Sequence, residues 1–182
     1  MSHVFSDKEN IHACEQWLES VYTYGQRVSN AVVVGTGLAT GVRTTIVMPP
    51  TVWGAGTGLV NRFSMQIPVA FAAALRRGRA FRVSDYPQAR YSHVHAEDFA
   101  RLYEILLERV VGGQDVPHGE RGFLFANAGE FAWPEFWERA AKALYKRGRI
   151  ESEELLTLTL KEAADELCGG DEHIVEVAFA AK

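Results

Sequence analysis

Residues 43–58 read RTTIVMPPTVWGAGTG, and the predicted fold is organised around this stretch. Thr44 to Met48 is a short run rich in β-branched residues, which favours a buried strand. Pro49-Pro50 ends the strand, because proline has no ladder donor and keeps the residue before it extended. In open α/β sheets, ligands bind beyond the carboxyl ends of the strands. We therefore expect a ligand cleft along the loop that follows, which carries Gly54, Gly56 and Gly58.

Composition excludes several classes of protein. The chain has 182 residues, 47% of them hydrophobic, which suits one globular domain. With 19 Lys and Arg against 23 Asp and Glu the net charge is −4, and no basic block could follow a phosphate backbone, so we expect no nucleic-acid partner. No window approaches the roughly 20 apolar residues of a membrane helix, and no secretory signal is apparent. Because Cys14 and Cys168 lack metal-like or CxxC spacing, we expect a cytoplasmic protein with reduced thiols.

The region before the central strand is predicted to be helical. Ser6 to Glu9 fits a capping box, and apolar residues then recur at helical spacing to about Val34, which favours one long helix with Gly25 as its weak point. Residues 31–41 read AVVVGTGLATG and admit two interpretations. One is the strand and turn of a dinucleotide fingerprint, but the next strand begins too soon for the helix that must open on the glycines. The other, a helix that ends at a glycine, is the one we favour.

Further helices are predicted downstream from apolar periodicity and from glycine and proline positions, at residues 66–78, 96–111, 133–145 and 159–169. The last begins with a capping box at Thr159. Short strands are predicted at residues 80–84, 91–95 and 123–126. The apolar face of the helix at 66–78 is expected to comprise Val69, Phe71, Ala72 and Leu75. About 75 residues, including predicted helices, separate the buried strand at residues 44–48 from the buried strand at residues 123–126. This separation indicates a crossover connection in an α/β sheet.

Three motifs carry a resemblance to a known family. Residues 48–54 (MPPTVWG) resemble the Arg-Pro-x-x-Val-Tyr-Gly-Pro loop of extended short-chain dehydrogenases/reductases, the NAD-dependent epimerase/dehydratase group. Residues 94–100 (VHAEDFA) resemble its Val-His-Val-Asp-Asp-Leu-Ala motif, and residues 125–129 (FANAG) its Tyr-Asn-Ile-Gly strand end. The resemblance extends over about residues 20–148, and Gln66-Ile67-Pro68 is similar to the same helix in fungal members.

The resemblance implies an α/β fold with a partial Rossmann-like, doubly wound sheet and a mostly helical substrate-side subdomain. Nothing matches the family's N-terminal βαβ units, so we expect the carboxyl-terminal portion of such a protein. Residues 1–182 would form a single domain, with residues 6–53 and 90–128 on the Rossmann side and residues 54–89 and 129–182 on the substrate side. Sheet edges left open would favour a homo-oligomer.

The resemblance also implies a catalytic Tyr-x-x-x-Lys pair, in which the lysine lowers the pKa of the tyrosine. Tyr24 is the best-placed tyrosine, but Val28 stands four residues later. Arg27 is the nearest cation, and it cannot be assumed to replace lysine. Tyr24 and Arg27 are therefore candidates for proton transfer, with a surface tyrosine and a solvated arginine as the alternative. The family's cofactor is NAD or NADP, which this chain alone is expected not to bind tightly.

Binding residues follow from the same resemblance. Pro49, Pro50, Thr51 and Val52 would border the nicotinamide, although a rigid turn that merely ends a strand is the alternative. Thr51, Asn61, Arg62, Ser64 and Arg90 are candidates for contacting a small-molecule substrate. Arg90 lies one residue before the phosphate-binding arginine of nucleotide-sugar enzymes, which argues against such substrates. His93 and His95 share one face of a strand, but no third ligand is apparent, so we expect no metal.

Two functions remain open from the sequence. The first is the substrate-side portion of an NAD(P)-dependent oxidoreductase or epimerase, not catalytically competent alone. The second is a non-catalytic member of the family that binds a dinucleotide, a metabolite or another protein. The missing lysine favours a non-catalytic protein. The intact cleft loop favours an oxidoreductase or epimerase as its ancestor.

Overall fold

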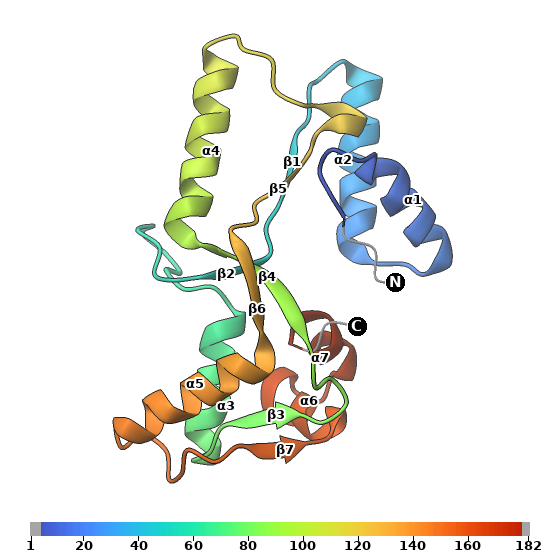
Figure 1. Ribbon diagram of the computed structural model, residues 1–182. Helices are drawn as coiled ribbons and strands as arrows, with labels where there is room; N and C mark the ends of the chain where they lie inside the picture. The colour runs from blue at the N-terminus through green and yellow to red at the C-terminus, as the bar shows by residue number, and fades with distance from the viewer. Residues whose placement is uncertain (1–4, 180–182) are drawn as a thin grey trace. The chain divides into compact units, whose positions relative to one another are not determined.

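The computed structural model describes residues 5–179 and divides them into two compact units (Figure 1). The described parts of the first unit are residues 5–50 and 98–127, and those of the second are residues 51–97 and 128–179. The chain therefore passes between the units directly after Pro50, after Glu97 and after Asn127. This division assigns residues 51–53 and 90–97 to the second unit, whereas the sequence-based grouping places them on the Rossmann side.

The first unit begins with two helices, α1 (Ile11–Val21) and α2 (Gly25–Thr40). The prediction of one long helix is therefore wrong, whereas the weak point predicted at Gly25 is confirmed, because the break lies directly before this residue. Residues 22 and 24 are extended, and the Glu19 carboxylate accepts a hydrogen bond from the Tyr24 backbone N–H at 3.0 Å. The capping box at Ser6 is also wrong. Asn10 caps α1 instead, because its side chain accepts from the Ala13 N–H at 3.0 Å.

Helix α2 continues through the glycines at 35 and 37 and ends at Gly41, which has a left-handed φ of 73°. Residues 31–34 are thus helical, which excludes the dinucleotide fingerprint and confirms the helix with a glycine stop. Gly37 serves close packing, since a Cβ there would lie 2.6 Å from the Thr44 methyl carbon. The glycine lets the chain return tightly alongside α2.

A parallel pair of strands follows in the first unit. Strand β1 (Ile46–Met48) pairs with β5 (Phe123–Phe125), with Ile46 opposite Phe123. Between them in sequence lie α4 (Ala96–Val111), whose bounds are as predicted, and the short 3₁₀ helix η1 (Gly119–Arg121). A small core of Ile11, Val34 and Phe123 packs against β1 and β5. The parallel pairing confirms the crossover and the partial Rossmann-like α/β class, although β1 is shorter than predicted.

The second unit contains two small sheets. The first has the order β2-β4-β6, formed by β2 (Thr51–Trp53), β4 (Arg90–His95) and β6 (Gly129–Ala132), in which β2 is parallel and β6 antiparallel to β4. The second pairs β3 (Phe81–Val83) with β7 (Leu156–Leu158) in parallel. The prediction identified β3 and β4 but not β2, β6 or β7. These missed strands have three or four residues each, and each of them pairs with a strand that is distant in the sequence.

Four helices complete the second unit: α3 (Gln66–Arg77), α5 (Trp133–Lys146), α6 (Leu160–Cys168) and α7 (Glu172–Ala178). The first three agree with the prediction to within about a residue at their starts, and the capping box of α6 is confirmed by reciprocal bonds between Thr159 and Glu162. The short α7 was not predicted. None of the helices within residues 5–179 is long and apolar enough to cross a bilayer.

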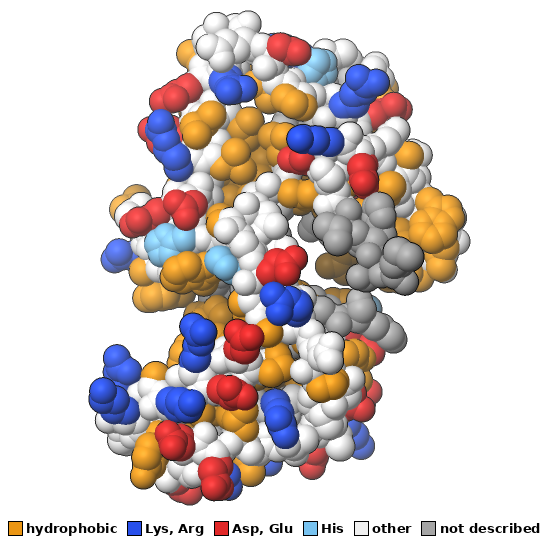
Figure 2. Space-filling view, viewed as in Figure 1, with side chains coloured by type: hydrophobic (Ala, Val, Ile, Leu, Met, Phe, Trp, Pro, Cys, Tyr) orange, Lys and Arg blue, Asp and Glu red, His pale blue; other side chains and the backbone are white. Residues whose placement is uncertain are grey.

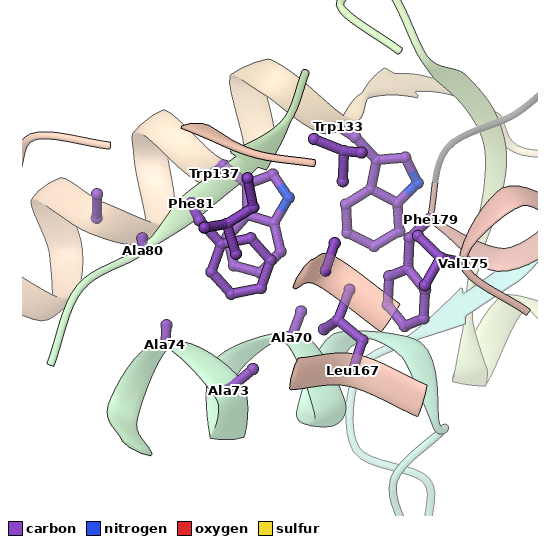
Figure 3. Packing of buried hydrophobic residues seen from close by; sticks show 14 of the residues in the cluster. Ala70, Ala73, Ala74, Ala80, Phe81, Trp133, Trp137, Leu167, Val175 and Phe179 are labelled. Atoms are coloured by element: carbon purple, nitrogen blue, oxygen red, sulfur yellow. The ribbon is translucent and has the colours of Figure 1, made fainter. Parts of the chain in front are cut away.

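An aromatic cluster forms the core of the second unit (Figure 3). Phe81 stacks on Trp137 with ring centroids 4.7 Å apart, and the alanines of α3 lie beneath them. The buried residues of α3 are Ala70, Ala73 and Ala74, whereas Leu75 is 42% exposed. The predicted apolar face is therefore correct only in part: Val69 and Phe71 pack against this core, Leu75 does not, and the fully buried positions hold alanines because large rings occupy the adjacent space.

Candidate functional site: a pocket in the second unit

A pocket of about 530 Å³ lies on one face of the β2-β4-β6 sheet. The strands contribute Thr51, Trp53, His93 and residues 130–132, and the helices α3 and α5 contribute Ile67, Glu135, Phe136 and Arg139. All of these residues belong to the second unit. The volume is within the range of about 300–1,000 Å³ that is usual for small-molecule sites.

Strand geometry explains why these side chains meet. Alternate residues of a strand point to the same face, so Thr51 and Trp53 share one side of β2. In the parallel register Thr51 lies opposite His93, and in the antiparallel register Tyr91 lies opposite Phe131. The pocket is thus made of one face of three strands that are far apart in the sequence.

Thr51 is the predicted substrate residue that the structure places in this pocket. It is only 3% exposed, and its Oγ1 has no hydrogen-bond partner among residues 5–179. Buried hydroxyls are normally hydrogen-bonded, because an unpaired one loses its contacts with water without compensation. The Thr51 hydroxyl is therefore a buried, unpaired polar group next to the pocket, and its oxygen is closed to solvent.

Trp53 and the two histidines form a contact network beside Thr51. The Trp53 indole N–H donates to His93 Nδ1 at 3.1 Å, and the Trp53 ring meets the His95 ring edge-on with centroids 4.6 Å apart. Gly54 has a φ of +91°, and a Cβ there would lie 2.2 Å from His95 Nε2, so only glycine fits. Within the described residues, no group of His, Cys, Asp and Glu is arranged to hold a metal.

The other predicted substrate residues lie outside the pocket lining. Arg62 Nε donates to the Gly56 carbonyl at 2.8 Å, and the Ser64 hydroxyl donates to the Val52 carbonyl, so both residues brace the loop. Asn61 is in the loop with a φ of 46°. Arg90 forms an exposed ion pair, at 3.4 Å, with Glu130 of the pocket lining. The structure therefore gives Arg62 and Ser64 structural partners and brings Arg90 to the rim of the pocket.

The predicted cofactor residues are divided between the units. Pro49 and Pro50 end the first unit, and Thr51 and Val52 begin the second. Val52 pairs with Val94 in the β2–β4 ladder, on the face opposite to Thr51. The prolines therefore mark the junction at which β1 ends and β2 begins.

Tyr24 and Arg27 are brought together in the first unit. The Arg27 guanidinium lies 5.2 Å from the centroid of the Tyr24 ring and 4.4 Å from that of Tyr22. Arg27 donates to the Tyr22 carbonyl at 2.7 Å and to Glu19 at 3.2 Å, and the residue is 8% exposed. The Tyr24 backbone N–H, with Arg27 as a weaker contributor, lowers the pKa of Glu19. Arg27 is therefore buried and hydrogen-bonded to Tyr22 and Glu19, and it is not solvated.

The sequence did not predict a buried polar group on α1 and α2. Asn30 Nδ2 donates to both carboxylate oxygens of Glu15, at 2.9 and 3.2 Å, and both residues are buried. Burial raises the pKa of Glu15 above its ordinary value of 4.5, against the opposing effects of Asn30 and Arg27. One indication of this buried group was present in the sequence: Glu15 lies on an otherwise apolar face of its helix.

Glu15→Gln is expected to make the protein more stable at neutral pH than the unchanged chain. Burial raises the pKa of the Glu15 carboxyl in the folded state, so as the pH rises above 4.5 this carboxyl loses its proton in the unfolded chain first. The free energy of unfolding of the unchanged chain therefore decreases as the pH rises from 4.5 through the raised pKa. The advantage of the variant should shrink towards pH 4. Urea unfolding from pH 4 to 8 measures it, with the exposed Glu153→Gln as control. A difference between Glu15→Gln and the unchanged chain that does not vary with pH would contradict the assignment.

The fold defines a class of protein. The parallel pairing of β1 with β5, which are joined by a crossover connection that contains α4, is typical of Rossmann-like α/β proteins. The chain belongs to the NAD-dependent epimerase/dehydratase family, whose model matches residues 3–118. No curated protein and no solved structure matches the chain. The family-level resemblance is thereby confirmed.

Members of this family use NAD or NADP as cofactor. The described residues show whether this chain could bind the pyrophosphate of such a cofactor. A pyrophosphate seat needs glycines at the opening of a helix. Gly25 is the first residue of α2, but helix α1 and not a strand precedes it; Gly35 and Gly37 lie inside α2, and Gly54 packs against His95. The described residues therefore do not fit the pyrophosphate of the cofactor.

Proposed function

We propose that this chain is the substrate-side portion of an NAD(P)-dependent oxidoreductase or epimerase of the extended short-chain type, and that it is not catalytically competent alone. The family match carries the proposal, and the pocket that contains Thr51, directly after Pro49-Pro50, supports it. Gln66-Ile67-Pro68 supports an affinity with fungal members. Two unpaired cysteines, Cys14 and Cys168, support a cytoplasmic location.

Tyr24 and Arg27 stand where the family has its Tyr-x-x-x-Lys pair. A cation close to a tyrosine favours the ionised form, which is the role of lysine in such a pair. Arg27 contacts the Tyr24 ring, but its hydrogen bonds go to Tyr22 and Glu19. This geometry supports the absence of independent catalysis. It also keeps open the second function, a non-catalytic family member that binds a metabolite or a protein.

Titration with NADH and NADPH tests the proposal. We expect no binding tighter than about 1 mM, which corresponds to only about 4 kcal/mol, because the pyrophosphate has no seat among residues 5–179. Isothermal titration calorimetry measures it, with adenosine as a control for weak adenine binding. A micromolar dissociation constant for either cofactor would overturn the proposal. Hydride transfer from NADH to a ketone by the chain alone would do so as well.

Self-association is a further part of the proposal. Strands β1 and β5 pair only with each other within the described chain, and open strand edges promote pairing with another copy. Hydrophobic side chains reach the surface of the first unit near α4, β1 and β5 (Figure 2), and Leu107 and Val111 of α4 are 64% and 79% exposed. Sedimentation velocity over a hundredfold dilution should show a concentration-dependent dimer or larger species. A compact monomer at every concentration would contradict this expectation.

A further inference from the structure

The loop between β2 and α3 is a braced hairpin. Ala55 and Phe63 form an antiparallel bridge. Beyond this bridge, the Gly56 N–H donates to the Arg62 carbonyl at 2.7 Å, and Arg62 Nε donates to the Gly56 carbonyl at 2.8 Å. These contacts join the two arms of the hairpin and fix the base from which residues 57–61 project. We call residues 57–61 the loop tip.

The loop tip carries apolar side chains that the rest of the described chain leaves uncovered. Leu59 is fully exposed and Val60 is 86% exposed. Phe63 and Met65, which follow the tip in the sequence, are 60% and 68% exposed. Hydrophobic side chains are visible around this loop in Figure 2. Exposed apolar patches are rare on monomeric proteins and usually mark an interaction site.

An apolar pocket of about 470 Å³ lies at the base of the hairpin. Helix α3 lines it with Ile67, Pro68 and Phe71, and the hairpin lines it with Gly54, Ala55, Phe63 and Ser64. Ser64 provides the one polar side chain of this lining, and its hydroxyl already donates to the Val52 carbonyl. Small-molecule sites need polar groups that orient the ligand, so this lining is better suited to apolar side chains of a protein.

A second copy of the chain offers apolar side chains that match this pocket. In the folded chain the tip stays outside its own pocket, since Leu59 and Val60 are exposed and neither of them lines it. Tip and pocket are neighbours on the same hairpin, so a twofold axis beside them brings the tip of each copy to the pocket of the other. One reciprocal contact then covers both apolar surfaces of both copies.

The area of such a contact is sufficient for a dimer. A large apolar side chain removes roughly 100 Å² of apolar surface from water when it is buried. The exposed side chains of residues 59, 60, 63 and 65 in two copies, together with the pocket walls that they cover, reach about the 1,000 Å² that a specific interface requires. None of these four side chains is charged, so their burial needs no ion-pair partner.

We propose that the second unit forms a twofold dimer in which Leu59 and Val60 of each copy insert into the apolar pocket of the other. The contact requires neither a cofactor nor a substrate, so it does not depend on the proposed enzymatic function. It is also separate from the self-association proposed for the open strands of the first unit, because all of its residues belong to the second unit.

Substitution of the tip tests the dimer. Leu59→Ser combined with Val60→Ser removes the apolar side chains at exposed positions, where the fold does not depend on them. Both this variant and its reference chain carry Leu107→Ser and Val111→Ser, which remove exposed apolar side chains of α4 from the first unit. In sedimentation velocity, we expect the tip substitutions to lower the dimer association constant at least about tenfold.

Ile174→Ser combined with Val177→Ser is the matched control, because it removes two aliphatic side chains from α7, an exposed helix of the same unit. In the same reference chain, this change should leave the association constant as it was. A reference chain that is monomeric at every concentration would overturn the proposal. So would an association constant that falls as much in the α7 control as in the tip variant, or in neither.

Paramagnetic relaxation enhancement identifies the pocket that receives the tip. A nitroxide is attached at Thr57→Cys in an unlabelled chain whose Cys14 and Cys168 are replaced by serine, and this chain is mixed with ¹⁵N-labelled unchanged protein. Broadening then arises only between copies, and we expect it to be strongest at the amides of Ile67 and Phe71. Strongest broadening at β1 or β5, or none at concentrations at which dimers form, would refute the reciprocal contact. Neither measurement involves NADH, so the cofactor titrations test the proposed function separately.

Discussion

Trp137→Ala is expected to destabilise the second unit by about 3–5 kcal/mol, because it removes a large ring from the centre of the core. Trp137 is 2% exposed and stacks on Phe81 with ring centroids 4.7 Å apart. Its removal would leave a cavity bordered by Phe81 and Trp133, rigid rings that cannot collapse into the space. Urea unfolding followed by far-ultraviolet circular dichroism measures the loss.

Tyr145→Ala is the matched control, because it removes an aromatic ring from the same helix, α5, at a position that is 49% exposed. Surface substitutions of this kind usually change stability by no more than about 0.5 kcal/mol. If Trp137→Ala cost less than about 1 kcal/mol, or no more than Tyr145→Ala, the aromatic cluster would not be the stabilising core of this unit.

Arg27→Ala is expected to destabilise the first unit by about 2 kcal/mol, since hydrogen bonds from a charged group contribute more than neutral ones. The change removes the donors to the Tyr22 carbonyl and to Glu19, and it removes the planar group that packs on the Tyr22 ring. Arg27→Lys should restore little, because a single ammonium cannot reproduce the fork of donors or the stacking. Thermal unfolding compares the three proteins.

Arg101→Ala is the control for charge. Arg101 pairs with Glu104 at 2.5 Å, but its side chain is 57% exposed, and exposed ion pairs contribute little. Its replacement should leave the unfolding midpoint unchanged within error. A midpoint that shifts as much for Arg101→Ala as for Arg27→Ala would show that the loss of a positive charge, and not the buried contacts, causes the effect.

Predictions from the sequence succeeded where the signal is local. Two adjacent prolines end β1, a glycine with positive φ ends α2, and the Thr159–Glu162 capping box starts α6. Each of these signals depends only on residues that are close together in the sequence, so it acts independently of how the rest of the chain folds. The same reasoning failed for Ser6, because Asn10 offered a better-placed cap to the helix that forms.

Predictions failed where the answer depends on a distant partner. Strands β2 and β6 exist because both pair with β4, which is remote from each of them in the sequence. The buried face of α3 consists of alanines because Phe81 and Trp137 occupy the core next to it. The burial of Glu15 follows from its contact with Asn30 on the neighbouring helix. None of these contacts produces a hydrophobic periodicity that could be detected in the sequence.

Short motifs and strand ends in the amino-acid order were enough to establish the α/β class, the family, and Thr51 as a candidate binding residue. Three features became visible only in the folded chain: Thr51 is buried beside His93, Trp53 orients this histidine, and Arg27 is held by Tyr22 and Glu19. The difference arises because hydrogen bonds and ring contacts depend on distances in space, which strand register and helix packing set.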